Sequence, residues 1–192
     1  PEATRSTMEE LEGALKKGGG KAAGPDHVPP ILLRKLCGEG KRRLLDLLNQ
    51  CWEKAFVPII WRRAIIIPVL KKGKSESEIK SYRPVSLLSV VGKTLESMVA
   101  TRVSCWAEET GMIPDEQAGF RQGRSVEECV VRIAQKHFTG LNRDKPAHRS
   151  ISVAIDLEAA FDKVWRRGAL RTLAQADFPR AWLRSRWPST TP

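Results

Sequence analysis

The fold prediction starts from the stretch ISVAIDLEAAFDKVW, which covers residues 151–165. Branched apolar residues alternate with small ones in its first half, so Ile151, Val153 and Ile155 share one face of a predicted strand. The opposite face carries only small side chains until the carboxylate of Asp156 at the end of the strand. A strand that leaves room on one face and then presents a carboxylate indicates a site for a bulky ligand.

The positive charge of the chain is large and unevenly distributed. The 192 residues carry a formal net charge of +11, and the pI is about 9.9. Three segments hold seven basic residues each, against two, three and one acidic residues: 62–83, 121–149 and 163–192. Such clustering favours a surface for a polyanion such as nucleic acid, with solvated basic faces as the alternative. The length and the hydrophobic content of 41% suit one globular domain or two small ones.

The four cysteines are widely spaced, and none belongs to a CxxC pair. No histidine lies at ligand spacing from them, so zinc binding is not expected. Cys51, Cys105 and Cys129 fall within helical patterns, which predicts reduced core cysteines in an intracellular protein. The sequence shows no signal peptide and no apolar run of about 20 residues, so neither secretion nor a membrane partner is expected.

Hydrophobic periodicity and capping signals predict a chain that is rich in helix. The first helix is expected over residues 4–17, with a capping box at Thr7 and Glu10, and the following glycine run is expected to form a linker. Further helices are predicted over residues 31–37, 41–56 and 94–110, after Ser125, and over 168–176 and 180–186. Core positions are predicted at Leu44, Leu45, Leu48, Cys51, Trp52 and Phe56.

Two segments are predicted to pair as a basic hairpin. The run WRRAIIIPVLKKGK, residues 61–74, reads as a strand that enters a basic turn, and YRPVSLL, residues 82–88, reads as the return strand. The continuous apolar run predicts burial on both faces, whereas Pro68 indicates an edge or a bulge. Cations near the hairpin mouth suit a triphosphate or a backbone phosphate, although a solubilising turn fits the spacing equally well. These cations are Lys71, Lys72, Lys74 and Arg83.

The loop over residues 112–124 contains two glycines and places one aromatic residue, Phe120, between polar groups. This arrangement suits contact with a sugar, a base or a template backbone.

Five motifs follow one another in an order that resembles the reverse transcriptases of non-LTR (LINE-type) retrotransposons. They are AGPD (23–26), WRRAIIIPVLKKG (61–73), YRPVSLL (82–88), QAGFR with GRS (117–125) and AIDLEAAFD (154–162). The resemblance implies an RNA-directed DNA polymerase with a right-hand shape. It therefore predicts an α+β fold, helix-rich with a small antiparallel sheet, in which an N-terminal helix and linker (1–22) precede a fingers-like region (23–150) and a truncated start of the palm (151–192).

The resemblance also assigns roles to individual residues. Asp156 matches the first metal-binding, catalytic aspartate of the palm, and Leu157 would add a backbone carbonyl to a site that holds two Mg²⁺ ions for nucleotidyl transfer. Phe161 matches the aromatic residue that excludes a ribose 2′-hydroxyl. The remaining matches are Lys71 or Lys72 with Arg83, which would hold the incoming triphosphate, and Phe120 with Arg121, which would line the template and nucleotide path. The implied partners are an RNA template, a DNA primer and dNTP, and the implied place of action is the nucleus.

One departure from the family pattern bears on activity. The family carries a later palm motif with paired aspartates, which this sequence lacks, and Asp177 stands alone. One carboxylate does not hold two metal ions. We therefore expect a truncated or frameshifted polymerase that is inactive by itself. The alternatives are a non-catalytic remnant that binds RNA or an RNA–DNA hybrid, and a poorly folded product of a decayed element.

Overall fold

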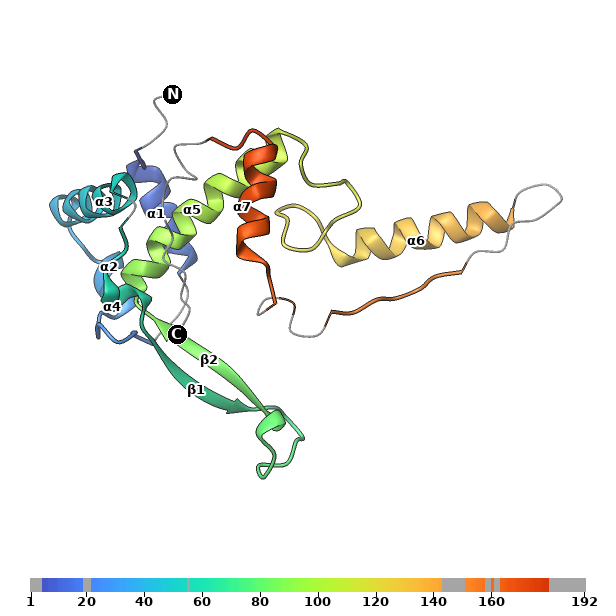
Figure 1. Ribbon diagram of the computed structural model, residues 1–192, viewed down its shortest axis with the longest axis horizontal. Coiled ribbons are helices and arrows are strands. Elements are labelled where there is room, and N and C mark those ends of the chain that lie inside the picture. Colours follow the sequence, from blue (N-terminus) through green and yellow to red (C-terminus); the bar gives the residue numbers. More distant parts are fainter. Residues whose placement is uncertain are drawn as a thin grey trace. The chain divides into compact units, whose positions relative to one another are not determined.

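A computed structural model describes residues 5–18, 22–54, 56–142, 151–157, 160 and 163–179. These residues are mostly helical, with one two-stranded antiparallel sheet, as the sequence predicts (Figure 1). The chain divides into two compact units, a first unit of residues 1–103 with 177–192 and a second unit of residues 104–176. The elements in chain order are α1 (Met8–Lys17), α2 (Pro30–Arg34), α3 (Gly38–Glu53), α4 (Ile59–Arg62), β1 (Ala64–Leu70), the 3₁₀ helix η1 (Ile79–Ser81), β2 (Tyr82–Leu88), α5 (Val90–Glu109), α6 (Val126–Leu141) and α7 (Arg166–Gln175).

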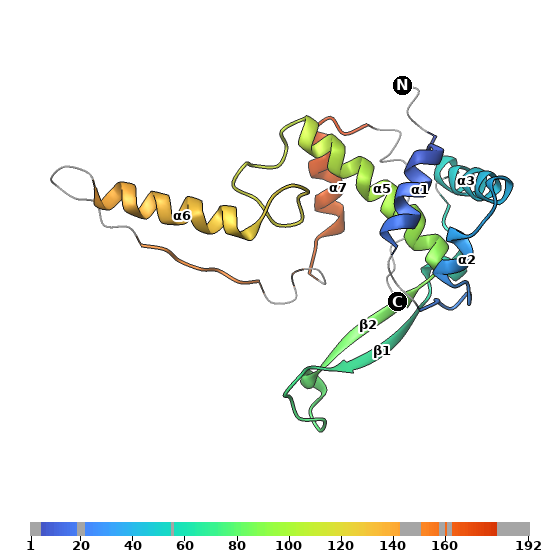
Figure 2. The ribbon, with the colours of Figure 1, turned by 180° about the vertical axis from the view of Figure 1, so that it is seen from behind.

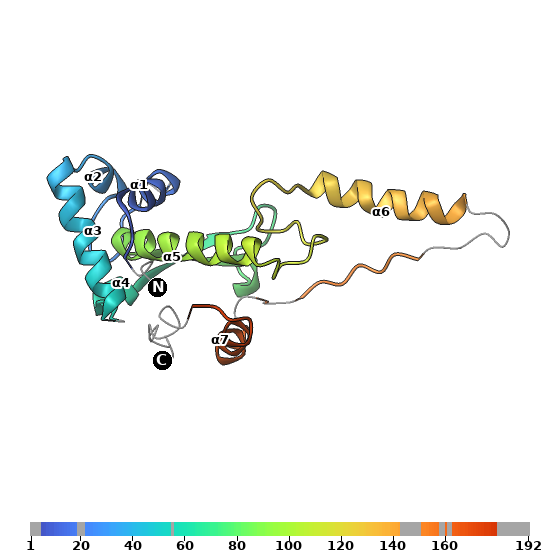
Figure 3. The ribbon, with the colours of Figure 1, turned by 90° about the horizontal axis from the view of Figure 1, so that it is seen from above.

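The core of the first unit forms where α1, α2 and α3 gather around the N-terminal half of α5 (Figure 3). Leu11, Leu48 and Met98 are fully buried, one from each of three helices. Apolar residues recur at helical spacing on these elements, so each helix has one apolar face to bury. The buried cluster consists of Leu11, Ala14, Leu15, Leu33, Leu44, Leu48, Cys51, Val90, Val91, Leu95 and Met98.

Some of the predicted core residues are not buried. Phe56 is 57% exposed, because α3 ends at Glu53 and the helical spacing that predicted its burial does not continue to it. Cys105 is exposed and Cys129 is intermediate, so Cys51 alone of the three helical cysteines is buried. All four cysteines are free thiols.

The predicted capping box of α1 is present and also joins α1 to α5. The Glu10 amide donates to Thr7 Oγ1 at 3.3 Å, and the Thr7 amide donates to Glu10 Oε2 at 2.7 Å. The same Glu10 carboxylate accepts from Arg102 on α5, with distances of 2.5 Å to Nε and 2.8 Å to Nη2. The Arg102 side chain is only 11% exposed, so this bidentate pair is shielded from water and stronger than a surface ion pair.

A polar clasp joins the AGPD motif to the junction between β2 and α5. The buried Ser89 hydroxyl donates to Asp26 Oδ2 at 2.5 Å and accepts from the Gly92 amide at 3.2 Å. Asp26 Oδ1 accepts from the Val28 amide at 3.3 Å. Gly24 lies so close to the chain that a Cβ atom would sit 2.4 Å from the Leu88 carbonyl carbon and oxygen. The motif is recognisable in the sequence, but its structural role depends on these distant partners.

The predicted hairpin is present, with β1 antiparallel to β2 in a register from Ala64 opposite Leu88 to Leu70 opposite Tyr82. The prediction of burial on both faces is wrong, because β1 is exposed along almost its whole length. Within the described residues the two strands pair only with each other. Pro68 faces Pro84, so neither residue at this level donates to the ladder. The predicted strand also starts later than expected, because Trp61 lies in α4.

The second unit contains the C-terminal end of α5, a long loop, α6, an extended segment over residues 151–157, and α7. Ser125 caps α6 as predicted and accepts from the Glu128 amide at 3.3 Å. The predicted strand at residues 151–157 is wrong, because the segment is exposed and joins no ladder. A strand needs a hydrogen-bonded partner, and the sheet of the described residues contains β1 and β2 only. The predicted helix over residues 180–186 lies outside the described residues.

None of the helices that the structure describes combines the length and the apolar character that a bilayer crossing requires.

The close approach of Gly24 yields a stability prediction. We expect Gly24→Ala to lower the free energy of unfolding by about 1–3 kcal/mol, because the methyl group meets the Leu88 backbone, which cannot move aside easily. Gly13→Ala is the matched control, since Gly13 lies within α1 and a Cβ atom there would have no other atom within 4 Å. It should raise the free energy of unfolding by about 0.5–1 kcal/mol. Urea denaturation followed by circular dichroism measures both, and an unchanged midpoint for Gly24→Ala would contradict the packing.

Candidate functional site

The first candidate site is the loop end of the hairpin in the first unit, where residues 71–81 connect β1 to β2. Arg83 lies opposite Val69 in the ladder, and Lys71 and Lys72 follow directly after β1. The Lys71 amide donates to the Ser81 carbonyl at 2.8 Å, which extends the pairing beyond the end of β1. The predicted nucleotide-binding cations are therefore brought together by the hairpin register.

These cations keep their charge available for a ligand. Lys71 Nζ donates to the uncharged Lys80 carbonyl at 2.7 Å, while the Lys72 and Arg83 side chains are exposed. Among the described residues no ion pair involves any of the three predicted cations. The loop also carries Glu76 and Glu78, so its acidic groups only partly offset its basic ones. The arrangement can bind phosphate oxygens through several cationic donors.

The second candidate site is the loop between α5 and α6, which Arg121 organises from within. The Arg121 guanidinium donates to both carboxylate oxygens of Glu108, at 2.8 Å from Nε and 2.5 Å from Nη2. Its Nη1 donates to the carbonyls of Pro114 at 2.7 Å and Gln117 at 3.1 Å. The Arg121 side chain is 7% exposed. We call this set of contacts the Arg121 clamp; it closes the loop onto the end of α5.

The clamp shifts the ionisation of both partners. Hydrogen bonding to Arg121 holds the pKa of Glu108 below its ordinary value. The same hydrogen bond, donated by Arg121 to the Glu108 carboxylate, raises the pKa of Arg121. Both groups are therefore charged at neutral pH, and a charge-assisted bidentate pair is geometrically specific as well as strong. Sequence reasoning missed this internal role, because Glu108 and Arg121 lie in different elements and share no local pattern.

Two further arginines, Arg124 and Arg132, connect the loop to α6. Arg124 donates to Asp115 at 3.0 Å and to Glu128 at 3.1 Å. Arg132 on α6 donates to the same Glu128 carboxylate at 2.7 Å and to the Asp115 carbonyl at 3.2 Å. These contacts fix the start of α6 against the loop.

Phe120 is presented at the surface by this loop. Its side chain is 97% exposed, and its backbone adopts a positive φ of 60°. A left-handed conformation costs a non-glycine residue roughly 1–2 kcal/mol, and such strain is frequent at binding sites. Phe120 precedes Arg121 directly, so the Arg121 clamp fixes the backbone that carries the exposed ring. An exposed aromatic face on a fixed loop can stack with a planar ligand.

The predicted catalytic residues lie in the extended segment of the second unit. Asp156 is exposed, its Oδ1 accepts from the Leu157 amide at 2.9 Å, and Leu157 is exposed as well. Among the described residues no group of three or more His, Cys, Asp and Glu side chains comes together as a metal site. The described residues therefore do not fit a two-metal centre. Phe161, predicted to exclude the ribose hydroxyl, lies outside the described residues.

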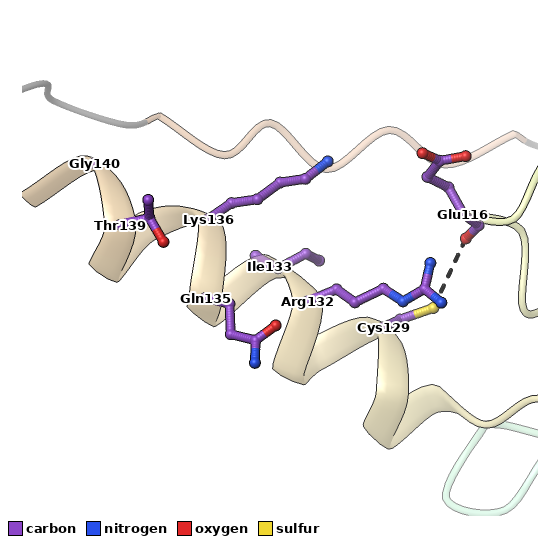
Figure 4. A pocket seen from close by; sticks show the side chains of 8 residues that line it. All are labelled: Glu116, Cys129, Arg132, Ile133, Gln135, Lys136, Thr139 and Gly140. Carbon is purple, nitrogen blue, oxygen red and sulfur yellow. Dashed lines mark hydrogen bonds between the residues drawn. The ribbon is translucent and has the colours of Figure 1, made fainter.

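A pocket of about 650 Å³ lies along α6 in the second unit (Figure 4). The Cys129 thiol points toward the Glu116 carbonyl at 4.0 Å, and Lys136 extends over the same side of the helix. None of the predicted site residues lines this pocket. The lining residues are Glu116, Cys129, Arg132, Ile133, Gln135, Lys136, Thr139 and Gly140.

Comparison with protein families identifies the family of this chain. Residues 69–191 match the family described as "Reverse transcriptase (RNA-dependent DNA polymerase)". The chain belongs to the reverse transcriptase family. The matched region of this reverse transcriptase chain covers the candidate site residues of the hairpin, of the loop between α5 and α6, and of the segment with Asp156.

Individual relatives come from mobile elements of flies. The chain is 37% identical over 150 residues to the "Probable RNA-directed DNA polymerase from transposon BS" of Drosophila melanogaster, which is 78% of this chain and 16% of that protein. It is 32% identical over 167 residues to the "RNA-directed DNA polymerase from mobile element jockey" of Drosophila funebris, 87% of this chain and 18% of that protein. These matches confirm the resemblance to reverse transcriptases of non-LTR retrotransposons. The chain thus spans less than a fifth of the length of these relatives.

The Arg121 clamp yields a prediction on loop order. We expect Arg121→Met to lower the hydrogen-exchange protection of the amides at positions 112, 117 and 121 several-fold. The last two amides bond within the clamped loop, and the Met112 amide ties the start of the loop to the Ala107 carbonyl of α5. Arg171→Met is the matched control, because Arg171 is an exposed residue of α7 in the same unit. Equal protection in both variants would show that the clamp does not hold the loop.

The same comparison has a defined pH dependence. The pKa of Glu108 is lowered in the folded chain, so the clamp stabilises fully above the ordinary glutamate pKa of about 4.3 and is lost as the pH falls through the lowered value. The difference in protection between the native chain and Arg121→Met should be largest at neutral pH and should shrink in acid. A difference that grows on acidification would contradict this assignment.

Proposed function

We propose that this chain forms the fingers and the start of the palm of an RNA-directed DNA polymerase of a non-LTR retrotransposon. In this proposal residues 1–22 are an N-terminal helix and linker, 23–150 the fingers, and 151–192 the start of the palm. The observation that carries the proposal is the hairpin, whose register gathers uncompensated cations at one end in a chain of this family. The substrates would be an RNA template, a DNA primer and dNTP, and the polymerase would act in the nucleus.

The hairpin would hold the triphosphate of the incoming nucleotide. The site offers two ammonium groups and one guanidinium, from Lys71, Lys72 and Arg83. A triphosphate presents several anionic oxygens that accept hydrogen bonds from such groups. Electrostatic stabilisation of this kind also lowers the energy of the charge that develops on phosphate oxygens during transfer. The backbone hydrogen bond from Lys71 to Ser81 supports this role, because it fixes the backbone that carries the first of these cations.

The Phe120 loop would line the path of the template and the nucleotide. A nucleobase stacked on an aromatic ring gains roughly 1–3 kcal/mol regardless of its identity. Arg121 would act through Phe120 as a positioning residue, since its guanidinium is already engaged by Glu108 and two carbonyls. The strained backbone of Phe120 supports this proposal.

The palm segment would contribute part of a metal site. We assign Asp156 and the Leu157 carbonyl as ligands of Mg²⁺ in the complete polymerase, where the metal would promote nucleotidyl transfer, and Phe161 as the residue that excludes ribonucleotides. Because no group of three or more His, Cys, Asp and Glu side chains comes together among the described residues, this chain alone is proposed to be inactive. The second candidate function is binding of RNA or an RNA–DNA hybrid without chemistry, which the net charge of +11 favours.

The hairpin assignment predicts a selective loss of nucleotide affinity. Lys72→Gln with Arg83→Gln should weaken dNTP binding to the complex of this chain with an RNA–DNA template–primer by about 100-fold, on the basis of roughly 1.5 kcal/mol for each charged contact. Lys16→Gln with Lys35→Gln removes the same charge from exposed positions outside the hairpin and is the control. Equal dNTP affinity in the two double variants would favour the non-catalytic binding function.

Primer extension tests the proposed inactivity. With template–primer, dNTP and Mg²⁺, the chain should add no nucleotide, because one exposed carboxylate does not hold two metal ions. Template-dependent incorporation that disappears in Asp156→Ala would contradict this expectation and would show that the chain completes its own metal site.

A further inference from the structure

A cavity lined by cationic side chains lies in the first unit. It lies between the end of α1, the short helix α2 and the first turns of α5, which Figure 2 shows close together. Its volume is about 210 Å³. Ala14, Leu15 and Val90 give it an apolar wall, and no carboxylate is among its lining residues. The remaining lining residues are Lys17, Gly18, Ala22, Pro30, Arg34, Lys93, Thr94 and Ser97.

Three cations from three different helices converge on this cavity. Lys17 Nζ donates to Thr101 Oγ1 at 3.3 Å, and Arg34 Nη2 donates to the Gly18 carbonyl, so both interact with uncharged acceptors. Lys93 is exposed at the first turn of α5. In the part of the chain that the structure describes, none of the three cations takes part in an ion pair.

Two of the neighbouring carboxylates are engaged by cations outside the cavity. On α1, Glu10 pairs with Arg102 at 2.5 Å and Glu12 pairs with Lys41 at 2.8 Å. On α5, burial raises the pKa of Glu96 while Lys93 lowers it, so Glu96 partly offsets the charge of Lys93. Three positive charges held near one another repel, and a bound anion relieves that repulsion.

We propose that this cavity binds one phosphate group of a nucleic-acid strand. Two ammonium groups and a guanidinium match the oxygens of a phosphodiester, and the Ser97 side chain adds a hydroxyl to the lining. The apolar wall suits the sugar that carries the phosphate. The site is separate from the hairpin cations and does not depend on polymerase chemistry, so it extends the nucleic-acid contact of the first unit to the faces of α1 and α5.

Amide resonances of the intact ¹⁵N-labelled chain test the proposal. Inorganic phosphate, and separately a hexameric oligouridylate, should shift the amides of Gly18, Lys93 and Ser97. In the double variant Lys17→Gln with Lys93→Gln these shifts should disappear, and the affinity for oligouridylate should fall about tenfold or more. The slope of log affinity against log salt concentration should become smaller by roughly 0.7 for each lost phosphate contact. Lys16→Gln with Lys35→Gln, which removes the same charge outside the cavity, should retain the shifts.

The outcomes separate the possible ligands. Shifts at these amides with both probes, lost only in the cavity variant, support a strand phosphate. Shifts with inorganic phosphate that oligouridylate neither reproduces nor displaces would overturn the proposal in favour of a site for free phosphate. Absence of shifts with either probe in the native chain, or equal loss in both variants at unchanged circular dichroism, would overturn it entirely.

Discussion

The hydrogen bond from the buried Ser89 hydroxyl to Asp26 is the interaction on which the first unit depends. It lies where β2 ends and α5 begins, and it attaches the AGPD motif to that junction. A buried hydroxyl or carboxylate left without its partner costs about 1–3 kcal/mol or more, so the contact strongly disfavours other arrangements of the loop. The direction in which the hairpin leaves the core and the start of α5 are set at the same point. β2, which carries Arg83, and α5, which carries Lys93, meet at this point.

Arginines among the described residues differ in how their charge is used. Arg102 and Arg121 are nearly buried and form bidentate pairs with Glu10 and Glu108, so their charge is consumed in holding helices and a loop in place. Arg83 is exposed and forms no ion pair among the described residues, so its charge is available to a ligand. The net charge of +11 alone therefore does not tell which cations pair with carboxylates within the fold. This division supports a fixed frame that presents basic groups to phosphates.

Sequence reasoning succeeds here where the signal is local. The capping boxes and helical periodicity predict α1, α3, α5 and α6 with shifted ends, and the turn-rich segment between two apolar runs predicts the hairpin. It fails where the outcome depends on distant partners. The apolar run of β1 predicts burial, yet burial needs a covering element, and the alternation at residues 151–157 predicts a strand, yet a strand needs a second strand. The Arg121 clamp could not be predicted for the same reason, because its members lie in different elements. The cations of the hairpin could be predicted because they flank one turn.

The central claim is that the hairpin of this reverse transcriptase chain receives the triphosphate of a nucleotide. The most direct measurement is photoaffinity labelling with a dNTP that carries a photoreactive group on its γ-phosphate, in the presence of an RNA–DNA template–primer, followed by peptide mass spectrometry. The account predicts that the label concentrates in the peptide of residues 71–83 and is displaced by unmodified dNTP. Label that concentrates elsewhere, or that spreads over exposed lysines without displacement by dNTP, would contradict it.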